Sequence, residues 1–401
     1  MSLKLGYKQT EIGVIPDNWQ TKTLGSLLDY EQPTPFLVIS TDYLEFSSVP
    51  VLTAGKTFIL GYTDEEHGVY KSLPVILFDD FTTACQWVDF PFKVKSSAAK
   101  ILSGRVGVSD TKFMHEYLLR LSYVPSDHQR HWISVFSSIE VIVPPIKEQK
   151  AIAEALSDVD ALIDALEALL IKKRNIKTGV MQELLTGRTR LPGFTADWQE
   201  VRLGAICDFV PTIALSRAQL EADEGVMCIH YGDIHTKFSD RLDIANAMLP
   251  KSETLLVARV PRLKVGDLVL ADASEDLVGV GKSVEIVSVG SVEVVGGLHT
   301  VVLRPKVGNF APGFAGLLQH TPRFKEQSRV LAAGLKVYGL SKTSISKILV
   351  FVPPVKEQKA IAAVLSDIDD EIEALEKRLA KTRDLKQGMA QELLTGRMRL
   401  V

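Results

Sequence analysis

The chain has 401 residues, 46% of them hydrophobic and 24% charged, which is the composition of a globular protein large enough for two or more domains. A net charge of −3 excludes a generally basic chain, so any nucleic acid would be bound through local patches or with charge from a partner. No apolar run has the length of a membrane span or the pattern of a signal peptide, and the three cysteines form no CxxC pair. We therefore expect a cytoplasmic protein without membrane contact.

Two segments of the chain have nearly the same sequence. "PPIKEQKAIAEALSDVD" begins at residue 144 and "PPVKEQKAIAAVLSDID" begins at residue 353. Segments 144–188 and 353–397 align without a gap, 29 of the 45 positions are identical, and both segments end in "QELLTGR". The period of about 200 residues is far longer than the units of solenoid proteins, so the chain contains an internal duplication of whole domains.

A weaker repeat precedes each of these segments. "WQTKTLGSLLDY" (19–30) matches "WQEVRLGAICDF" (198–209) in Trp, Gln, Leu-Gly, Asp and a terminal aromatic residue. Each repeat is therefore a variable block followed by a constant block, and the second variable block is the longer. In order along the chain the blocks are variable 1–143, constant 144–188, variable 189–352 and constant 353–401.

The variable blocks predict mixed α/β domains. Short apolar runs rich in β-branched residues, separated by Gly, Asp and Ser, are typical of strands. The expected strands are 73–78, 265–271, 283–290 and 299–305, and the expected helical segments are 115–124 and 311–327.

Each constant block predicts one long helix. Apolar or small residues recur in alternating steps of four and three, which is the heptad seam of a coiled coil. The Pro-Pro pairs favour a helix start, and Gly187 and Gly396 favour a helix end. A helix over 146–186 would be about 60 Å long. The expected helix–helix seam consists of Ile152, Leu156, Val159, Ile163, Leu166, Leu170, Ile361, Leu365, Ile368, Ile372, Leu375 and Leu379.

Polar residues occupy the seam near the end of each block, and a glycine lies inside each pattern. They are Lys173, Lys177 and Gly179 in the first block and Thr382, Lys386 and Gly388 in the second. A glycine inside a helix costs about 1 kcal/mol relative to alanine. Either the helix frays or bends there, or the seam ends and this part of the helix contacts another subunit or a phosphate backbone.

We find no complete catalytic motif in the sequence. "DLVGVGKSV" (276–284) ends like a phosphate-binding loop, but Asp276 stands where that motif needs glycine, and a strand rather than a helix is expected to follow. The Pro-Pro pairs lack the flanking residues of an adenine amino-methyltransferase, and we see no glycine-rich loop for a methyl donor. We therefore expect a non-catalytic chain.

Metal binding is not indicated either. His128 and His131 are three residues apart, with His115 upstream, but no Cys or carboxylate cluster completes a site. For His131 and Trp132 we expect a surface or DNA-facing position. The carboxylates of "FDD" (78–80) would point to opposite faces of a strand.

Present twice, each time after a variable block, the motifs "PPxKEQKAIA", "LSDxD" and "QELLTGR" make the sequence resemble the specificity subunit of a type I restriction-modification system. The resemblance covers essentially the whole chain. Residues 74–102 are similar to a recurrent pattern of the family's target recognition domains, and 226–234 and 263–274 occupy its two Asp-bearing strand–turn positions. "LVGVGKS" (277–283) is only loosely similar to the next glycine turn of the family.

The resemblance implies an α/β (α+β) fold. It has two mixed α/β target recognition domains separated by two long helices packed as an antiparallel coiled coil, with pseudo-twofold symmetry from the internal repeat. It also implies sequence-specific binding of double-stranded DNA, each domain reading one half of a bipartite, asymmetric target. From the helix length we expect half-sites of three to five base pairs, separated by several unread ones.

The partners implied by the resemblance are two methyltransferase subunits, held by the duplicated helices, and motor-nuclease subunits. The complex would methylate adenine N6 and cleave unmodified DNA with ATP. No cofactor is expected on this chain, and S-adenosylmethionine, ATP and magnesium would be bound by the partner subunits.

DNA-binding candidates were chosen from loops where hydroxyl, amide, aromatic and basic groups concentrate, because such groups contact base edges and phosphates. In the first variable block they are Thr82, Thr83, Gln86, Trp87, Lys93, Lys95 and Lys100. In the second they are Arg217, His230, Tyr231, His235, Lys237, Lys336, Tyr338 and Lys342.

Two alternative functions stay open at this point. The first is the specificity subunit of a modification-only or other defence system that lacks the nuclease. The second is a coiled-coil scaffold for protein partners that does not bind DNA, which the net charge of −3 favours and the motifs oppose.

Overall fold

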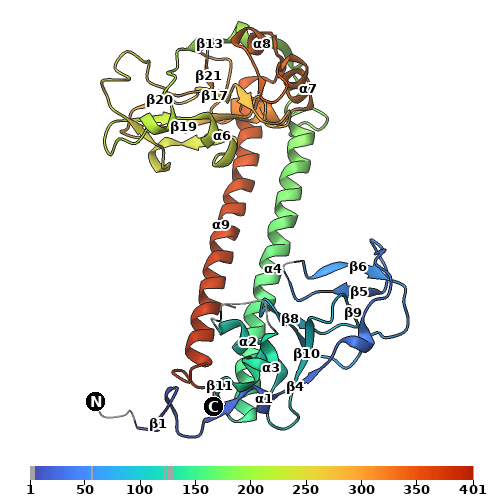
Figure 1. Ribbon diagram of the computed structural model, residues 1–401. Helices are drawn as coiled ribbons and strands as arrows, with labels where there is room; N and C mark the ends of the chain where they lie inside the picture. Colours follow the sequence, from blue (N-terminus) through green and yellow to red (C-terminus); the bar gives the residue numbers. More distant parts are fainter. Residues whose placement is uncertain (1–4, 56, 122, 124–129, 401) are drawn as a thin grey trace. The chain divides into compact units, whose positions relative to one another are not determined.

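The computed structural model describes residues 5–55, 57–121, 123 and 130–400. The chain divides into two compact units, which we call unit 1 (Met1–Ala168 with Lys377–Val401) and unit 2 (Leu169–Glu376). Each unit contains one variable block and a part of both long helices (Figure 1). The compact units therefore cut across the four sequence blocks.

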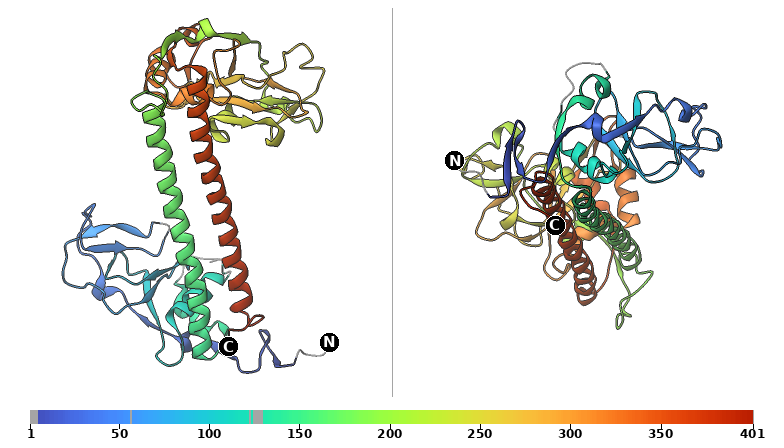
Figure 2. Two further views of the ribbon diagram at one scale, coloured as in Figure 1. Left: turned by 180° about the vertical axis from the view of Figure 1, so that it is seen from behind. Right: turned by 90° about the horizontal axis from the view of Figure 1, so that it is seen from below.

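The two long helices are α4 (Ile146–Leu184) and α9 (Val355–Leu393), each of 39 residues, as predicted. All twelve expected seam residues are buried or half-buried. The ion pairs between the helices show their direction, because the residue numbers on α9 fall as those on α4 rise, so within each unit the helices are antiparallel (Figure 2). These pairs are Asp160–Lys386 and Glu167–Arg383 in unit 1, and Arg174–Glu376 and Lys177–Asp369 in unit 2.

The variable blocks share a similar arrangement of strands although their sequences differ, and the larger sheet of unit 2 has one further strand at its edge. Each unit has a larger sheet and a three-stranded sheet whose central strand pairs antiparallel to one neighbour and parallel to the other. In unit 1 the strand order of the larger sheet is β4 (Leu28–Glu31), β10 (Ala99–Gly104), β7 (Val75–Asp79) and β8 (Cys85–Val88). The strand order of its three-stranded sheet is β6 (Ile59–Thr63), β5 (Val49–Leu52) and β9 (Lys93–Val94). In unit 2 the strand order of the larger sheet is β13 (Cys207–Val210), β21 (Thr300–Pro305), β17 (Leu268–Ala271), β19 (Ser283–Ser288) and β15 (Arg241–Asp243). The strand order of its three-stranded sheet is β16 (Lys251–Ser252), β14 (Val226–Ile229) and β20 (Val294–Gly296).

The four expected strands are thus confirmed as β7, β17, β19 and β21, whereas the boundaries of the expected helices differ. Helix α2 (Thr111–Arg120) begins earlier than expected because the carboxylate of Asp110 accepts the N–H of Phe113 and caps it. The segment 311–327 contains two helices, η5 (Ala315–His320) and α7 (Pro322–Leu331), since a capping threonine and a proline end one and start the next. The other elements are β1 (Tyr7–Thr10), β2 (Gly13–Pro16), α1 (Leu24–Leu27), η1 (Thr34–Phe36), α3 (His131–Ser134), η2 (Phe136–Ser138), α5 (Leu203–Ile206), η3 (Arg217–Gln219), α6 (Tyr231–Thr236), η4 (Ile244–Asn246), β18 (Ala273–Ser274), β22 (Tyr338–Gly339) and α8 (Lys342–Lys347).

The repeated residues of the sequence form the same clasp in both units. In unit 1 the buried carboxylate of Glu148 accepts the indole N–H of Trp19 at 3.0 Å and two guanidinium N–H groups of Arg399 at 2.5 and 2.7 Å. In unit 2 Glu357 accepts Trp198 at 3.2 Å and Arg190 at 2.5 and 2.6 Å. The arginine in each clasp follows the end of the other long helix, Arg399 after α9 and Arg190 after α4, so each repeat completes the unit of its counterpart.

A second pair of repeated residues holds the entry to each helix. The side chain of Gln149 donates to the carbonyl oxygens of Pro144 and Val108 and accepts the N–H of Asp110. Gln358 does the same with Pro353, Asn309 and Ala311 in unit 2. These contacts tie the start of each helix to a loop of its variable block.

Two short strand pairs complete the repeated framework. β3 (Gln20–Thr23) pairs with β11 (Glu140–Val143), and β12 (Gln199–Arg202) pairs with β23 (Leu349–Val352). Gly25 and Gly204 follow the first strand of each pair at a point of close approach, where an added Cβ would lie 3.0 and 2.7 Å from the nearest atoms of Ser137 and Ser346. The motif Trp-Gln…Leu-Gly is therefore repeated because its tryptophan and its glycine have the same packing role in both units.

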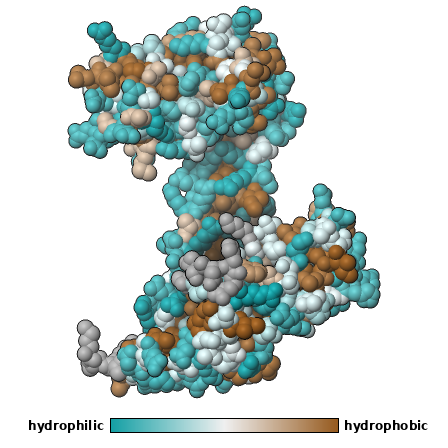
Figure 3. Space-filling view, in the orientation of Figure 1, coloured by the Kyte–Doolittle hydropathy of each residue, from teal (hydrophilic) through white to brown (hydrophobic). Residues whose placement is uncertain are grey.

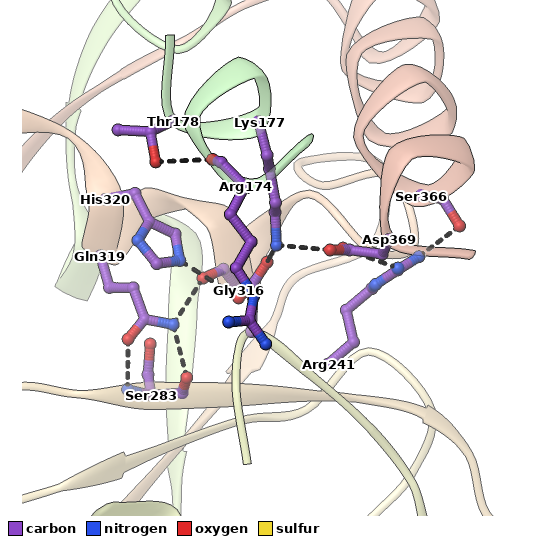
Figure 4. Close-up of polar contacts among 11 residues, drawn as sticks. Arg174, Lys177, Thr178, Arg241, Ser283, Gly316, Gln319, His320, Ser366 and Asp369 are labelled. Carbon is purple, nitrogen blue, oxygen red and sulfur yellow. Dashed lines mark hydrogen bonds and ion pairs between the residues drawn. The ribbon is translucent and has the colours of Figure 1, made fainter. Parts of the chain in front are cut away.

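In unit 2 a charged network, which we call the joint, connects the helices to the variable block (Figure 4). The ammonium of Lys177 on α4 lies 2.6 Å from Asp369 on α9 and 3.4 Å from Asp240, a buried residue of the variable block. His320 is 3.2 Å from Asp240, and Arg241 donates to both Ser366 and Asp369. Both helices and the domain thus share one set of charges.

The same joint recurs in unit 1. Lys386, the counterpart of Lys177, lies 2.7 Å from Asp160 on α4 and 3.2 Å from Glu116 on α2. Lys112 is 3.4 Å from Glu116. Both lysines are paired with acidic residues of their own unit, and the helices continue past them to Leu184 and Leu393, so the helices do not fray at these positions.

The hydrophobic cores lie between the sheets and the helix ends within each unit. One cluster of unit 1 joins Trp19 and Trp132 to Ile152 and Leu156 of α4, and the corresponding cluster of unit 2 includes Leu365 of α9. Figure 3 shows apolar side chains in small groups on a mostly hydrophilic surface. In the described part of the chain, the long helices included, we find no helix with the length and apolar content that crossing a bilayer requires.

We predict that Arg399→Ala lowers the free energy of unfolding by about 3 kcal/mol, because it leaves the buried carboxylate of Glu148 without its cation. Arg383→Ala is the matched control in the same unit, since Arg383 pairs with Glu167 at the surface and its loss should cost less than about 1 kcal/mol. Urea titrations of both variants measure the difference. Equal losses would contradict a structural role for the clasp.

A second prediction concerns acid stability. Burial alone would raise the pKa of Glu116, but the neighbouring His115 and the charges of Lys386 and Lys112 outweigh it and lower this pKa from 4.5 to about 2. Because the folded-state pKa lies below the unfolded one, the stabilisation is present above pH 4.5 and is lost as the pH falls toward 2. The shift corresponds to a stabilisation on the order of 3 kcal/mol.

Glu116→Gln should therefore flatten the decline of unfolding free energy between pH 4.5 and 2, measured by urea titration at each pH. Glu154→Gln, at an exposed position of α4 in the same unit, should leave the decline unchanged. If the Glu116 variant followed the wild-type curve, the joint would not contribute to acid stability.

Candidate nucleic-acid interface

Two loops of unit 1 meet at one edge of its larger sheet. The turn after β7 and the loop before β10 are joined by a hydrogen bond from the N–H of Asp80 to the carbonyl of Ala98, at 3.0 Å. The carboxylate of Asp79 accepts the N–H groups of Phe81 and Thr82, which fixes the turn. The first loop carries hydroxyl groups and the second a lysine.

The predicted residues of this loop pair lie at its surface. Thr82 is exposed, and Thr83 is half-exposed with a φ of 61°, a conformation that turns the chain back toward β8. Lys95 is exposed in the second loop, with its ammonium 5.2 Å from the centre of the Tyr43 ring. The structure thus leaves Thr82, Thr83 and Lys95 accessible at the surface, in two loops that one backbone hydrogen bond joins.

Gln86 and Trp87 lie on strand β8 and therefore face opposite sides of the sheet. The ring of Trp87 contacts α2, where the ammonium of Lys112 is 4.9 Å and the ring of His115 is 5.9 Å from it. Trp87 thus lies beside the joint of unit 1, and three of the seven predicted first-block residues belong to the two loops.

Two predicted lysines are buried and are not available to DNA. Lys93 is paired with Glu65 at 2.8 Å, and Lys100 is 3.4 Å from the buried Asp80 and donates to Gln32. Their long side chains pass inward because each finds a carboxylate there. The surface or DNA-facing position expected for His131 and Trp132 is also wrong, since both are buried and the N–H of Trp132 donates to Asp80.

In unit 2 an aromatic and imidazole cluster forms around Tyr231 on α6. The centres of the His230, His299 and His235 rings lie 4.7, 5.2 and 6.1 Å from the centre of the tyrosine ring. Burial and the charge of Arg217 lower the pKa of His230, so its neutral ring accepts the N–H of Gly232 through Nδ1. Tyr231 itself is half-exposed and offers a phenol and a ring face to a ligand.

Arg217 and Lys237 flank this cluster and share one buried acidic residue. Arg217 donates two hydrogen bonds to Asp233, at 2.9 and 3.0 Å, and Lys237 lies 2.9 Å from the same carboxylate. Burial would raise the pKa of Asp233, but the two cations lower it. Both basic side chains are about half exposed, so the pairing orients them without removing them from the surface.

The last three predicted residues lie in a distant part of the chain, and a short strand links Tyr338 to the same cluster. Strand β22 pairs with β18, placing Tyr338 opposite Ser274, and His235 contacts the carbonyl of Ala273 in the same strand at 2.9 Å. Lys336 and Lys342 are exposed on either side of β22. The short pairing of β18 with β22 therefore brings Tyr338 close to residues that are far from it in the sequence.

One surface residue of this edge escaped the sequence analysis. His299 has a φ of 53° and is exposed, and its Nδ1 lies 3.2 Å from the carboxylate of Asp272. The N–H of Asp272 donates to the carbonyl of His299, as Asp80 does to Ala98 in unit 1. His299 is thus the counterpart of Ala98 in the corresponding loop of unit 1. The two glycines shortly before His299 in the sequence could have indicated a loop at this position.

The chemistry of these edges is that of recognition. Hydroxyl, phenol, imidazole and ammonium groups can contact base edges and phosphates. Among the residues that the structure describes, no group of three or more His, Cys, Asp or Glu side chains is placed to hold a metal ion, and His128 lies outside them. Lys282 is followed by strand β19, which begins at Ser283, instead of a helix, as expected, so this segment does not have the strand–loop–helix form of a phosphate-binding loop.

Known proteins share both the sequence and the fold. The family described as type I restriction modification DNA specificity domain matches residues 113–173 and 195–382, more than half of the chain. The EcoR124I/EcoR124II specificity subunit of Escherichia coli is 44% identical over 155 residues, which cover 36% of this chain and 37% of that subunit. The MjaVIII specificity subunit of Methanocaldococcus jannaschii is 22% identical over 414 residues, which cover 96% of this chain and 94% of that subunit.

Solved structures agree on the fold. The S subunit of a type I restriction-modification system from M. genitalium superposes with a TM-score of 0.60 at 14% identity, over 94% of this chain and 96% of that one. A chain from a study of type I complex assembly superposes with a TM-score of 0.53 at 16% identity, over 96% and 99%. Two mixed domains and an antiparallel coiled coil are thus confirmed, and the chain belongs to the family of DNA specificity subunits of type I restriction-modification systems.

Proposed function

We propose that this chain reads a bipartite, asymmetric DNA target, with one half-site for each unit. The observation that supports this proposal is a difference between the buried contacts that both units share and the exposed loops, which differ between the units. The clasp, the joint and the strand pairs are the same in both units, whereas the loop edges differ in nearly every exposed side chain. Two domains that recognise different DNA sequences need the same internal packing and different exposed side chains.

Each edge offers a different set of groups to DNA. Unit 1 presents the small hydroxyls of Thr82 and Thr83 with Lys95, which suit contacts to bases and phosphates without bulk. Unit 2 presents the rings of Tyr231 and His299 with several basic side chains around them. The target is therefore asymmetric in this proposal, because unlike side chains select unlike bases.

The duplicated helices would hold two methyltransferase subunits and, through them, motor-nuclease subunits. A single chain with two equivalent halves can place two copies of one partner in pseudo-twofold positions. In this proposal S-adenosylmethionine, ATP and magnesium belong to those partners, which carry out adenine methylation and DNA cleavage. The chain itself supplies recognition and spacing and no catalytic group.

The spacer helices would set the unread gap between the half-sites. Each has 39 residues, so each is about 60 Å long. Duplex DNA rises about 3.4 Å for each base pair, so this length corresponds to more than one and a half turns of DNA. Half-sites of three to five base pairs with several unread pairs between them fit within that length.

The experiment that tests this function is a methylation map of DNA from cells that contain the chain and its neighbouring methyltransferase subunit. We expect N6-methyladenine at one asymmetric, interrupted sequence, and none at that sequence in cells that lack the chain. Methylation that did not depend on the chain, with the methyltransferase active, would overturn the proposal. A symmetric or uninterrupted target would overturn its bipartite part alone.

A lysine pair tests the DNA-facing edge of unit 1. We predict that Lys95→Ala weakens DNA binding by the complex and reduces the slope of log K against log salt by about one, since one phosphate contact is lost. Lys93→Ala should leave that slope unchanged and lower thermal stability, because Lys93 is buried against Glu65. Fluorescence anisotropy at several salt concentrations measures both slopes. An unchanged slope for Lys95→Ala would remove this loop from the interface.

A further inference from the structure

His299 and Asp272 are joined twice at the exposed edge of unit 2. The Nδ1 atom of His299 lies 3.2 Å from a carboxylate oxygen of Asp272, and the two side chains are 51% and 30% exposed. The N–H of Asp272 also donates to the carbonyl oxygen of His299, at 3.1 Å. One contact through the side chains and one through the main chain therefore hold the imidazole ring in a defined orientation.

The backbone at His299 has a conformation that side chains disfavour. Its φ is 53°, in the left-handed region that glycine adopts without steric cost. The loop before it is fixed, because an added Cβ at Gly297 would lie 2.7 Å from Sγ of Cys228, and the hydroxyl of Thr300 donates to the carbonyl of Gly297 at 2.6 Å. A histidine kept at such a position in a fixed loop indicates a function of its side chain.

Comparison with unit 1 shows that packing does not explain the aspartate of unit 2. Asp80 corresponds to Asp272 and Ala98 to His299, because the same backbone hydrogen bond joins each pair. The carboxylate of Asp80 is buried and lies 3.4 Å from the ammonium of the buried Lys100. Among the residues that the structure describes, only His299 contacts the carboxylate of Asp272. The aspartate has a packing role in unit 1, whereas in unit 2 it orients an exposed ring.

The orientation of His299 leaves one ring nitrogen available to a ligand. An ionised carboxylate can only accept, so Nδ1 donates its hydrogen to Asp272, and Nε2 of the neutral ring keeps its lone pair. No described residue of the chain donates a hydrogen bond to Nε2. The edge of unit 2 thus presents a fixed hydrogen-bond acceptor. In the major groove of DNA the matching donors are the exocyclic amino groups, N6 of adenine and N4 of cytosine.

We propose that His299 is a specificity-determining residue of unit 2, and that its Nε2 accepts a hydrogen bond from the exocyclic amino group of one adenine or cytosine in the target. Asp272 is a positioning residue that fixes the tautomer and the orientation of the ring. This inference rests on the proposed function and names the chemical group that one residue selects. Because Ala98 stands at the equivalent position of unit 1, the contact belongs to one half-site only.

Three variants separate this role from a role in folding. His299→Gly removes the ring at a backbone conformation that glycine adopts freely, so the fold should be kept. Asp272→Asn retains the size of the side chain, but its amide can donate to Nδ1, which moves the ring proton to Nε2 and turns the acceptor into a donor. Asp208→Asn is the matched control, since Asp208 is exposed and lies opposite Arg304, at the other end of β21.

The measurement uses the complex of the full chain with its neighbouring methyltransferase subunit. The probes are duplexes with the interrupted sequence found in the wild-type methylation map, and every base pair of both half-sites is replaced in turn. Fluorescence anisotropy should show that His299→Gly and Asp272→Asn lose discrimination, by about two- to 13-fold in Kd, at the same single position of one half-site. Asp208→Asn should discriminate as the wild type does. Loss at no position, or an equal loss of affinity for all duplexes, would overturn the role of His299.

A modified base at that position tests the acceptor itself. In this duplex hydrogen replaces the exocyclic amino group of the selected adenine or cytosine. The affinity of the wild-type complex should fall by about two- to 13-fold more than that of the His299→Gly complex, which has no acceptor to lose. Equal falls would show that His299 does not bind the amino group. A wild-type complex that preferred no sequence at all would instead overturn the proposed function.

Discussion

The buried glutamate at the start of each long helix is the contact on which the rest of the structure depends. Glu148 and Glu357 each bind a tryptophan from the beginning of a variable block and an arginine that follows the end of the opposite long helix. A buried carboxylate needs a cation and hydrogen-bond donors, so this requirement brings three distant segments together. Because each repeat supplies an arginine to its counterpart, neither unit is complete without both copies.

This exchange explains how one framework can hold two different readers. The clasp fixes one end of each variable block, and the joint of Lys386 with Glu116, or of Lys177 with Asp240, fixes the block against both helices. The loop edges lie outside these contacts. Their side chains can therefore change without loss of the buried pairs, which is the property that a family of DNA specificity subunits requires.

The sequence by itself determined the duplication, the two long helices, the seam and the strands β7, β17, β19 and β21, because periodicity and local propensity are encoded in neighbouring residues. Only the tertiary structure decided which lysines reach the surface. Lys93 and Lys95 are two residues apart, yet a carboxylate 28 positions before Lys93, that of Glu65, draws only Lys93 inward. Likewise His299 joins Tyr231, and Lys177 joins Asp240, through contacts between residues far apart in the chain. Such contacts depend on the placement of charges in three dimensions, which no local pattern of residues specifies.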